Sequence, residues 1–151
     1  MASLNLSNPA LALSFLSTPL SIIQLRPSQP LPVKLLQALT GHGGDQAFVS
    51  VTRCPEETSI ILPTALLGEL YPPSGPEQPA ESSGPWAALK VAGPMDLSLS
   101  GILHELTRPL KAAQVPIFAS STWNTDYVLI EERHKVAARE ALEKAGWRFT
   151  N

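Results

Sequence analysis

The sequence predicts an α+β fold of two tandem βαββα units, each with an antiparallel sheet and both helices on one face. Apolar residues recur at three- and four-residue spacing over 98–113, whereas short alternating runs bounded by Gly, Pro and Ser indicate strands elsewhere. Between the two halves, residues 71–85 hold five prolines and little that could pack. We therefore expect a first unit over 1–70, a loop over 71–85 and a second unit over 86–151.

Length and composition limit the classes of function. The chain has 151 residues, about one ordinary domain or two very small ones, and 44% of them are hydrophobic. A formal net charge of -2 provides no basic surface for a polyanion, so we expect no nucleic-acid partner. Cys54 is the single cysteine, which excludes an intramolecular disulfide.

The N-terminal segment 4–25 is apolar and uncharged, which could imitate a signal peptide or a membrane span. However, the first basic residue is Arg26, and several serines and prolines interrupt the apolar run. We expect two strand segments here, no membrane association and a cytoplasmic protein.

The second half has the clearer order of elements. Strands are expected over 86–92, 116–121 and 127–130, with helices over 98–113 and 133–145 and a possible edge strand over 147–149. The alternation places Ala87, Leu89 and Val91 on one face of the first strand. In the first half, strands are expected over 11–15, 20–25, 46–53 and 59–62, and short helices over 31–39 and 63–70.

The connection 93–101 is one candidate binding segment. Gly93 and Gly101 permit sharp turns, and Ser98 or Ser100 could cap the helix that follows. A helix N-terminus presents amide hydrogens and a partial positive charge, which suit a ligand carboxylate. The alternative is an ordinary strand-to-helix loop with a serine cap.

Asp126 is the second candidate, at the end of the loop 122–126 and directly before an apolar strand. Its carboxylate could accept hydrogen bonds from a ligand ammonium group. The alternative is a turn aspartate that bonds its own backbone.

Other chemistries have no supporting motif. The sequence contains no GxGxxG, Walker or GxSxG pattern, and His42, His104 and His134 are too scattered to suggest metal ligands. We therefore expect no catalytic residues, no metal and no cofactor.

The second half resembles a known family. Its strongest segments are GPMDLSLSGIL, PLKAA and STWNTDYVLI, and AFVSVTRCPEETSIIL in the first half is similar to the same family's first unit. These segments resemble the ACT domains of the CASTOR-type arginine sensors and their bacterial and fungal relatives. The resemblance implies ferredoxin-like ACT units (βαββαβ) and a non-catalytic, regulatory protein that binds an amino acid between units.

The resemblance also implies the site. Pro116 and Ile117 match strand residues whose backbone holds the amino-acid head group, and Asp126 matches the acid needed for binding. The loop that closes over the ligand corresponds to Gly101 and its neighbours Ser98 and Ile102. Leu99 stands where the arginine sensor has a glutamate that contacts its ligand, so the side-chain preference is expected to differ.

The sensor has four such units, whereas this chain has at most two. We therefore expect a homodimer in which second units pair, with a regulatory protein as a further possible partner. Two functions other than amino-acid binding remain open: a ligand-free dimerisation or scaffold protein of the same fold, and a small enzyme.

Overall fold

The computed structural model describes residues 4–41, 47–96 and 99–151. It divides into two compact units. Unit 1 contains the N-terminal segment up to Ser17 together with Trp86–Asn151, and unit 2 is Thr18–Pro85. The expected α+β class with antiparallel strands is confirmed.

Unit 2 consists of short strands and two short helices. In chain order they are β2 Leu20–Leu25, α1 Val33–Leu39, β3 Ser50–Arg53, β4 Thr58–Pro63, α2 Thr64–Leu70 and the first part of β5 Glu81–Val91. The sheet order is β3, β4, β2, β5, so the first strand of the unit lies between the third and the last. This is the strand order of a split βαβ fold.

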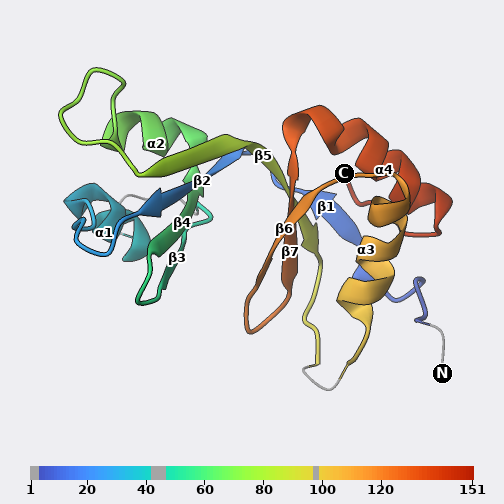
Figure 1. Cartoon of the computed structure of the whole chain (residues 1–151). Helices are drawn as coiled ribbons and strands as arrows, with labels where there is room; N and C mark the ends of the chain where they lie inside the picture. The colour runs from blue at the N-terminus through green and yellow to red at the C-terminus, as the bar shows by residue number, and fades with distance from the viewer. Residues whose placement is uncertain (1–3, 42–46, 97–98) are drawn as a thin grey trace. The chain divides into compact units, whose positions relative to one another are not determined.

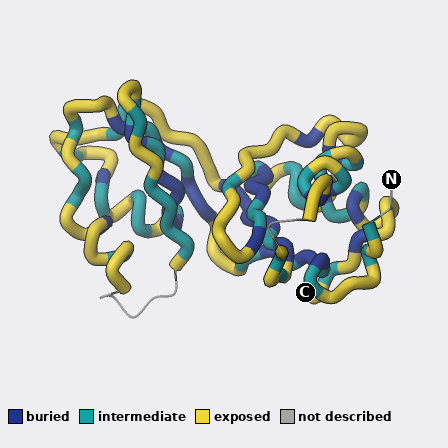
Figure 2. Tube along the Cα trace, turned by 90° about the horizontal axis from the view of Figure 1, so that it is seen from below, coloured by how far each residue is buried: buried dark blue, intermediate teal, exposed yellow. Residues whose placement is uncertain are grey.

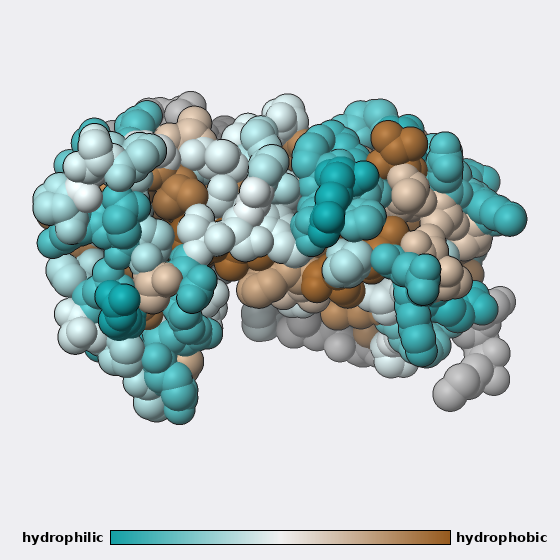
Figure 3. Space-filling view, turned by 45° about the horizontal axis from the view of Figure 1, so that its top comes forward, coloured by the Kyte–Doolittle hydropathy of each residue, from teal (hydrophilic) through white to brown (hydrophobic). Residues whose placement is uncertain are grey.

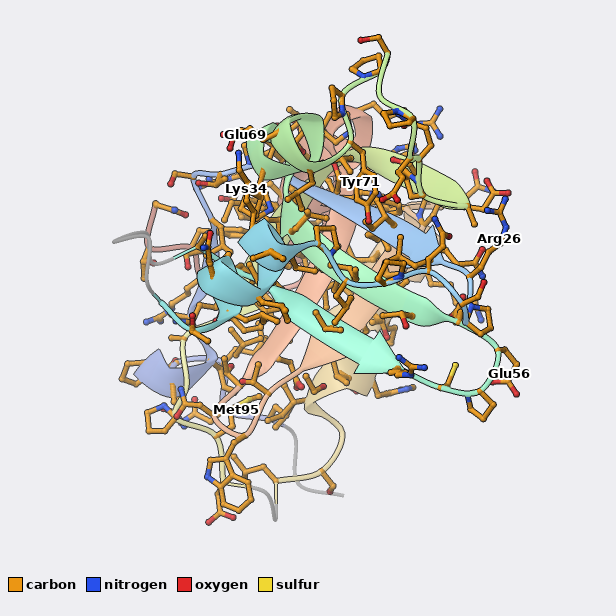
Figure 4. The ribbon with its side chains drawn as sticks, turned by 90° about the vertical axis from the view of Figure 1, so that its left-hand side faces the viewer. Arg26, Lys34, Glu56, Glu69, Tyr71 and Met95 are labelled. Atoms are coloured by element: carbon orange, nitrogen blue, oxygen red, sulfur yellow. The ribbon has the colours of Figure 1, made fainter. Side chains whose placement is uncertain are left out.

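The core of unit 2 lies between its sheet and its helices. It contains Ile23, Leu25, Ile60 and Leu62 from the central strands and Leu35 from α1. On the outer side, Lys34 of α1 and Glu69 of α2 face one another, with 3.9 Å between Nζ and Oε2 (Figure 4). Because both side chains are exposed, this ion pair contributes little stability.

Unit 1 has the longer helices. After a short 3₁₀ turn at Pro9–Leu11, its elements are β1 Leu13–Phe15, the second part of β5, α3 Ile102–Ala112, β6 Ile117–Ser121, β7 Asp126–Glu131, a 3₁₀ turn at Glu132–His134, and α4 Lys135–Lys144. The strand order is β1, β5, β7, β6, and every pair of neighbours is antiparallel.

Both helices of unit 1 cover one face of its sheet (Figure 1). The predicted face of β5, with Ala87, Leu89 and Val91, belongs to the core together with Leu106 of α3 and Leu142 of α4. The register places Leu89 opposite both Phe15 of β1 and Val128 of β7, so residues of one face align across three strands. Figure 2 shows that each unit contains both buried and exposed segments.

The division of the chain differs from the expected units 1–70 and 86–151. Strand β1 pairs with β5, with Leu13 opposite Val91, and thereby lies in the unit formed by the C-terminal half. The position beside β5 needs a strand to satisfy its backbone groups, and the N-terminal segment provides it. Unit 2 is thus inserted in the sequence of unit 1.

Three element boundaries also differ from the expectations. Strand β5 begins at Glu81, inside the segment 71–85 expected to be a loop, because the chain there pairs with β2: Ala80 N donates to Gln24 O at 2.8 Å. Helix α3 begins at Ile102 rather than at Ser98. The expected strand 147–149 is reduced to an isolated bridge between Phe149 and Leu13.

The start of α3 has a local cause. Gly101 precedes it with φ of +82°, a left-handed conformation that interrupts the helix. The expected cap by Ser100 is therefore wrong: the N-cap position is occupied by Gly101, and no side chain caps it. Leu99 precedes α3 in the chain and does not belong to the apolar stripe of the helix. Its exposed fraction is 48%.

Within the described residues, the structure has no helix long and apolar enough to cross a membrane.

Candidate functional site

Two loops of unit 1 meet at one end of its sheet: the connection from β5 to α3, and the turn between β6 and β7. Met95 N donates to Asn124 O at 2.9 Å, which joins the loops through their backbones. At Gly93, a Cβ atom would lie 3.0 Å from the backbone oxygen of Asn124, so only glycine fits this approach without displacement. The two loops that the sequence singled out are therefore neighbours in space.

The β6–β7 turn is held by its two threonines. Thr122 N and Oγ1 both donate to Thr125 O, at 2.8 and 3.0 Å, and Thr125 N donates back to Thr122 Oγ1 at 3.2 Å. Thr125 is buried, and its Oγ1 donates to Val91 O at 2.6 Å. These bonds fix the turn to the end of β5.

The N-terminus of α3 opens onto the same region. The first α-helical hydrogen bond runs from Glu105 N to Gly101 O at 2.9 Å, so the amides of Ile102, Leu103 and His104 precede the helical ladder. Amides in this position carry the partial positive charge of the helix terminus. Gly101, Ile102 and Leu103 all line a cavity between these elements.

A cavity of about 310 Å³ lies between these elements. Its lining residues are Met95, Asp96, Leu99, Gly101, Ile102, Leu103, Ser121, Thr122, Trp123, Asn124, Thr125 and Asp126. Two are carboxylates, and none of these described lining residues is Lys, Arg or His. The cavity lining thus includes both acidic side chains and the positive end of a helix.

Asp126 is the first residue of β7, not the last residue of the turn. It is half-buried, and its Oδ1 accepts a hydrogen bond of 2.6 Å from Ser121 Oγ across the hairpin. A carboxylate has lone pairs for several donors, so one hydrogen bond to Ser121 leaves capacity for a ligand. The serine also restricts the orientation in which the carboxylate is presented.

The cavity includes four of the predicted site residues: Leu99, Gly101, Ile102 and Asp126. Pro116 and Ile117 do not line it. Ile117 pairs with Ile130, whereas Ser121 pairs with Asp126, so Ile117 lies four residues away along β6, about 13 Å at ordinary strand spacing. Ser98 lies outside the described residues.

Three residues that line the cavity were not predicted as site residues: Trp123, Met95 and Asn124. Trp123 is 83% exposed at the tip of the turn, and Met95 lies in the loop that follows β5 (Figure 4). The signal that could have revealed them was the pairing of the two loops, which depends on a contact between residues some 30 positions apart. Local periodicity contains no information on such a contact.

A second, polar cavity of about 270 Å³ lies in unit 2, lined by Arg26, Gln29, Pro30, Tyr71, Pro76, Glu77 and Gln78. Gln29 Nε2 donates to Gln78 O at 2.9 Å, which joins the two loops that form it. Burial, and secondarily the nearby Glu77 carboxylate, raise the pKa of Tyr71 above its usual value. Among the described residues, the chain has no cluster of three or more His, Cys, Asp or Glu suited to a metal ion.

The strands, helices and loops around the first cavity lie within one stretch of sequence that matches a known family. Residues 81–144 match the family model of the ACT domain. The match extends from β5 to the end of α4 and covers both loops of the cavity. The sequence matched no curated protein.

Several solved structures share the fold. A protein from Agobacterium tumefaciens superposes with a TM-score of 0.72 at 23% identity, covering 91% of this chain and 90% of that one. Aspartokinase alpha and beta subunits give 0.64 at 20% identity, with 93% and 97% covered. The ligand-free regulatory subunit of aspartate kinase from Thermus thermophilus gives 0.56 at 15% identity, with 89% and 95% covered. Residues 81–144 are thus similar to the ACT domain, and the fold of the chain is shared with these structures.

Proposed function

We propose that this protein is a non-catalytic sensor that binds an α-amino acid at the cavity of unit 1. The observation that carries the proposal is the placement of opposite polarities within one cavity. Asp126 offers a carboxylate for the ligand's ammonium group, and the amides at the start of α3 offer donors for its carboxylate. An α-amino acid is a small molecule that has both groups on one carbon atom. The ACT domain match over the same residues supports this assignment.

The positions of Pro116 and Ile117 support a dimeric site. In one chain they are too far along β6 to reach a ligand at Asp126, although the resemblance assigns them to the head group. Strand β6 is the last strand of the sheet order, and both Ile117 and Phe118 are more than a third exposed. If two copies of β6 pair in antiparallel fashion about Ala119, Ile117 of the partner subunit lies opposite Ser121. We propose this homodimer, in which each cavity is completed by the other chain.

The proposal extends to the fold of both units. Unit 2 and unit 1 each have the strand order of a split βαβ fold, and we propose that they are two ACT units, one inserted into the other. A regulatory protein that recognises the liganded state is the further partner we propose, by analogy with the role of regulatory subunits.

Ligand binding is tested by a thermal-shift screen of the full chain against the twenty amino acids. At 100 times its dissociation constant, a specific ligand should stabilise the protein by about 2.7 kcal/mol. Replacing Asp126 with Ala should abolish the shift and leave the unliganded melting temperature almost unchanged, because the hydrogen bond that its carboxylate accepts comes from the exposed Ser121. No shift with any amino acid would favour a ligand-free scaffold.

The dimer is tested by light scattering after size-exclusion chromatography. Phe118→Arg places a charge on the exposed edge and should convert the dimer to a monomer. Val136→Arg, at an apolar position of α4 that is 70% exposed, is the matched control and should remain dimeric. A monomeric wild-type protein would contradict the proposed assembly without affecting the ligand screen.

A further inference from the structure

Trp123 differs from the other two tryptophans of the chain. It is 83% exposed, whereas Trp86 and Trp147 are 8% and 4% exposed. A single exposed apolar residue is common on protein surfaces and needs no function. However, the turn that carries Trp123 is fixed by the Thr122 and Thr125 hydrogen bonds, so the indole is presented from a defined position.

Two further apolar side chains line the cavity beside Trp123. Leu99 is 48% exposed, outside the hydrophobic core, and lines the same cavity as Trp123; Met95 packs against the core from the same loop. Figure 3 illustrates how apolar residues reach the surface among polar ones. These three lining residues, Leu99, Met95 and Trp123, are the apolar wall of the cavity, and burying their exposed surface against a ligand would gain free energy.

The charges in the cavity restrict the ligand further. An acidic ligand side chain would face Asp96 and Asp126 without a lysine, arginine or histidine among the described lining residues. The ammonium group of the ligand is assigned to Asp126. A basic ligand side chain would therefore need a second carboxylate. Asp96 could serve, but it already takes part in another interaction and its side chain is exposed, where a charge pair contributes little.

We infer that the cavity selects an amino acid with an uncharged, apolar side chain, which packs against Leu99, Met95 and Trp123. The inference rests on the proposed function, because it assumes that the ammonium and carboxylate groups lie at Asp126 and the start of α3. Leu99 and Trp123 are then the specificity-determining residues, and Asp126 determines only that an amino acid binds.

The test uses the full chain and two measurements of binding. Isothermal titration calorimetry gives the dissociation constants of leucine, methionine and phenylalanine, of arginine and lysine, and of aspartate and glutamate. The apolar group should bind at least about tenfold more tightly than either charged group, since burial of a large apolar side chain corresponds to at least that factor. Tryptophan fluorescence should shift to shorter wavelength with apolar ligands, and Trp123→Phe should remove the shift, because Trp86 and Trp147 are already buried.

Variants separate the side-chain contribution from the head-group contribution. Leu99→Ala should weaken leucine binding by about three- to tenfold and leave alanine binding unchanged, because alanine does not reach the wall. Leu36→Ala is the matched control: Leu36 is an apolar residue of α1 that is 44% exposed and does not line the cavity. It should affect neither ligand.

The possible results are distinguishable. If arginine, lysine, aspartate or glutamate binds as tightly as the apolar amino acids, the inference is wrong and the proposed function stands. Equal weakening of leucine and alanine by Leu99→Ala would also overturn it, because Leu99 would then act on the head group or on folding. If calorimetry detects no amino acid at all, the proposed function itself fails.

Discussion

Ser121 and Asp126 are direct partners in the β6–β7 register, and their side chains are also joined by a hydrogen bond of 2.6 Å from Ser121 Oγ to Asp126 Oδ1. The strand pairing sets the distance between the two residues, and the hydrogen bond sets the orientation of the carboxylate. Asp126 is thereby presented to the cavity in a restricted orientation before any ligand arrives, which lowers the entropic cost of binding.

We therefore expect Ser121→Ala to weaken amino-acid binding by about three- to tenfold, since a carboxylate that must be ordered on binding loses affinity. The free energy of unfolding without ligand should change by less than about 0.5 kcal/mol, because the Ser121 side chain is exposed. Calorimetry and urea denaturation measure the two quantities. Ser120→Ala, on the opposite face of the same strand, is the control and should leave the affinity unaltered. An equal effect of both variants would contradict the orienting role.

Thr125 should matter for folding more than for binding. It is 2% exposed, and its hydroxyl donates to Val91 O at 2.6 Å, which joins the β6–β7 turn to β5. Thr125→Val keeps the shape and removes the donor, leaving a carbonyl without this partner. We expect the free energy of unfolding to fall by about 1 to 3 kcal/mol, measured by urea denaturation.

The control for Thr125 is Thr107→Val. The Thr107 hydroxyl also donates to a backbone carbonyl, Leu103 O at 2.7 Å, but within one turn of α3. Valine there removes only local bonds within α3, to Leu103 O and His104 O, so we expect a change of less than about 0.5 kcal/mol. A loss as large as that of Thr125→Val would show that the hydroxyl, and not its tertiary connection, determines the cost.

The sequence predicted the parts of this fold that depend on local pattern. The stripe of α3 with Ile102, Leu106 and Leu110 and the alternation of β5 are periodicities that a single segment reveals. The pairing of Leu13 with Val91 is different, because it depends on which free strand edge the N-terminal segment meets. No local pattern specifies that choice, so the expected boundary of the first unit included residues 1–17.

The same division applies to the site. Gly93, Gly101 and Asp126 were recognisable because glycine and a carboxylate at the ends of elements have specific chemistry. The helix starts at Ile102 and not at the expected Ser98, because Gly101 adopts a left-handed conformation that the apolar periodicity does not reveal. The separation of Ile117 from Asp126 follows from the strand register, which could be drawn only once β6 and β7 had been paired.

Alkaline pH should destabilise unit 2 through Tyr71. Burial, with a smaller contribution from Glu77, raises the pKa of this phenol above 10.0 in the folded state. A raised folded-state pKa means that the native state binds the proton more tightly, so this stabilisation is present below pH 10 and is lost as the pH rises through the folded-state pKa. We expect the melting temperature to fall more steeply above pH 10 in the wild-type protein than in Tyr71→Phe. Parallel curves for the two proteins would exclude Tyr71 as the cause.

Gly93 and Gly101 provide a matched pair that separates backbone strain from steric conflict. Both have positive φ, +69° and +82°, so alanine at either position costs about 1 to 2 kcal/mol for the left-handed conformation. A Cβ at Gly101 meets nothing within 4 Å, whereas a Cβ at Gly93 lies 3.0 Å from Asn124 Nδ2 and O. The side-chain amide could move away, but the backbone oxygen belongs to the hydrogen bond with Met95 N.

We therefore expect Gly93→Ala to lower the free energy of unfolding by at least about 1 kcal/mol more than Gly101→Ala, measured by urea denaturation of both variants without ligand. The additional loss should come from displacement of the β6–β7 turn, since the Asn124 backbone has to move away from β5. Hydrogen exchange provides an independent readout: the Met95 amide should exchange faster in Gly93→Ala and at the wild-type rate in Gly101→Ala. Equal stabilities would mean that the two loops do not approach as closely as the Gly93–Asn124 contact requires.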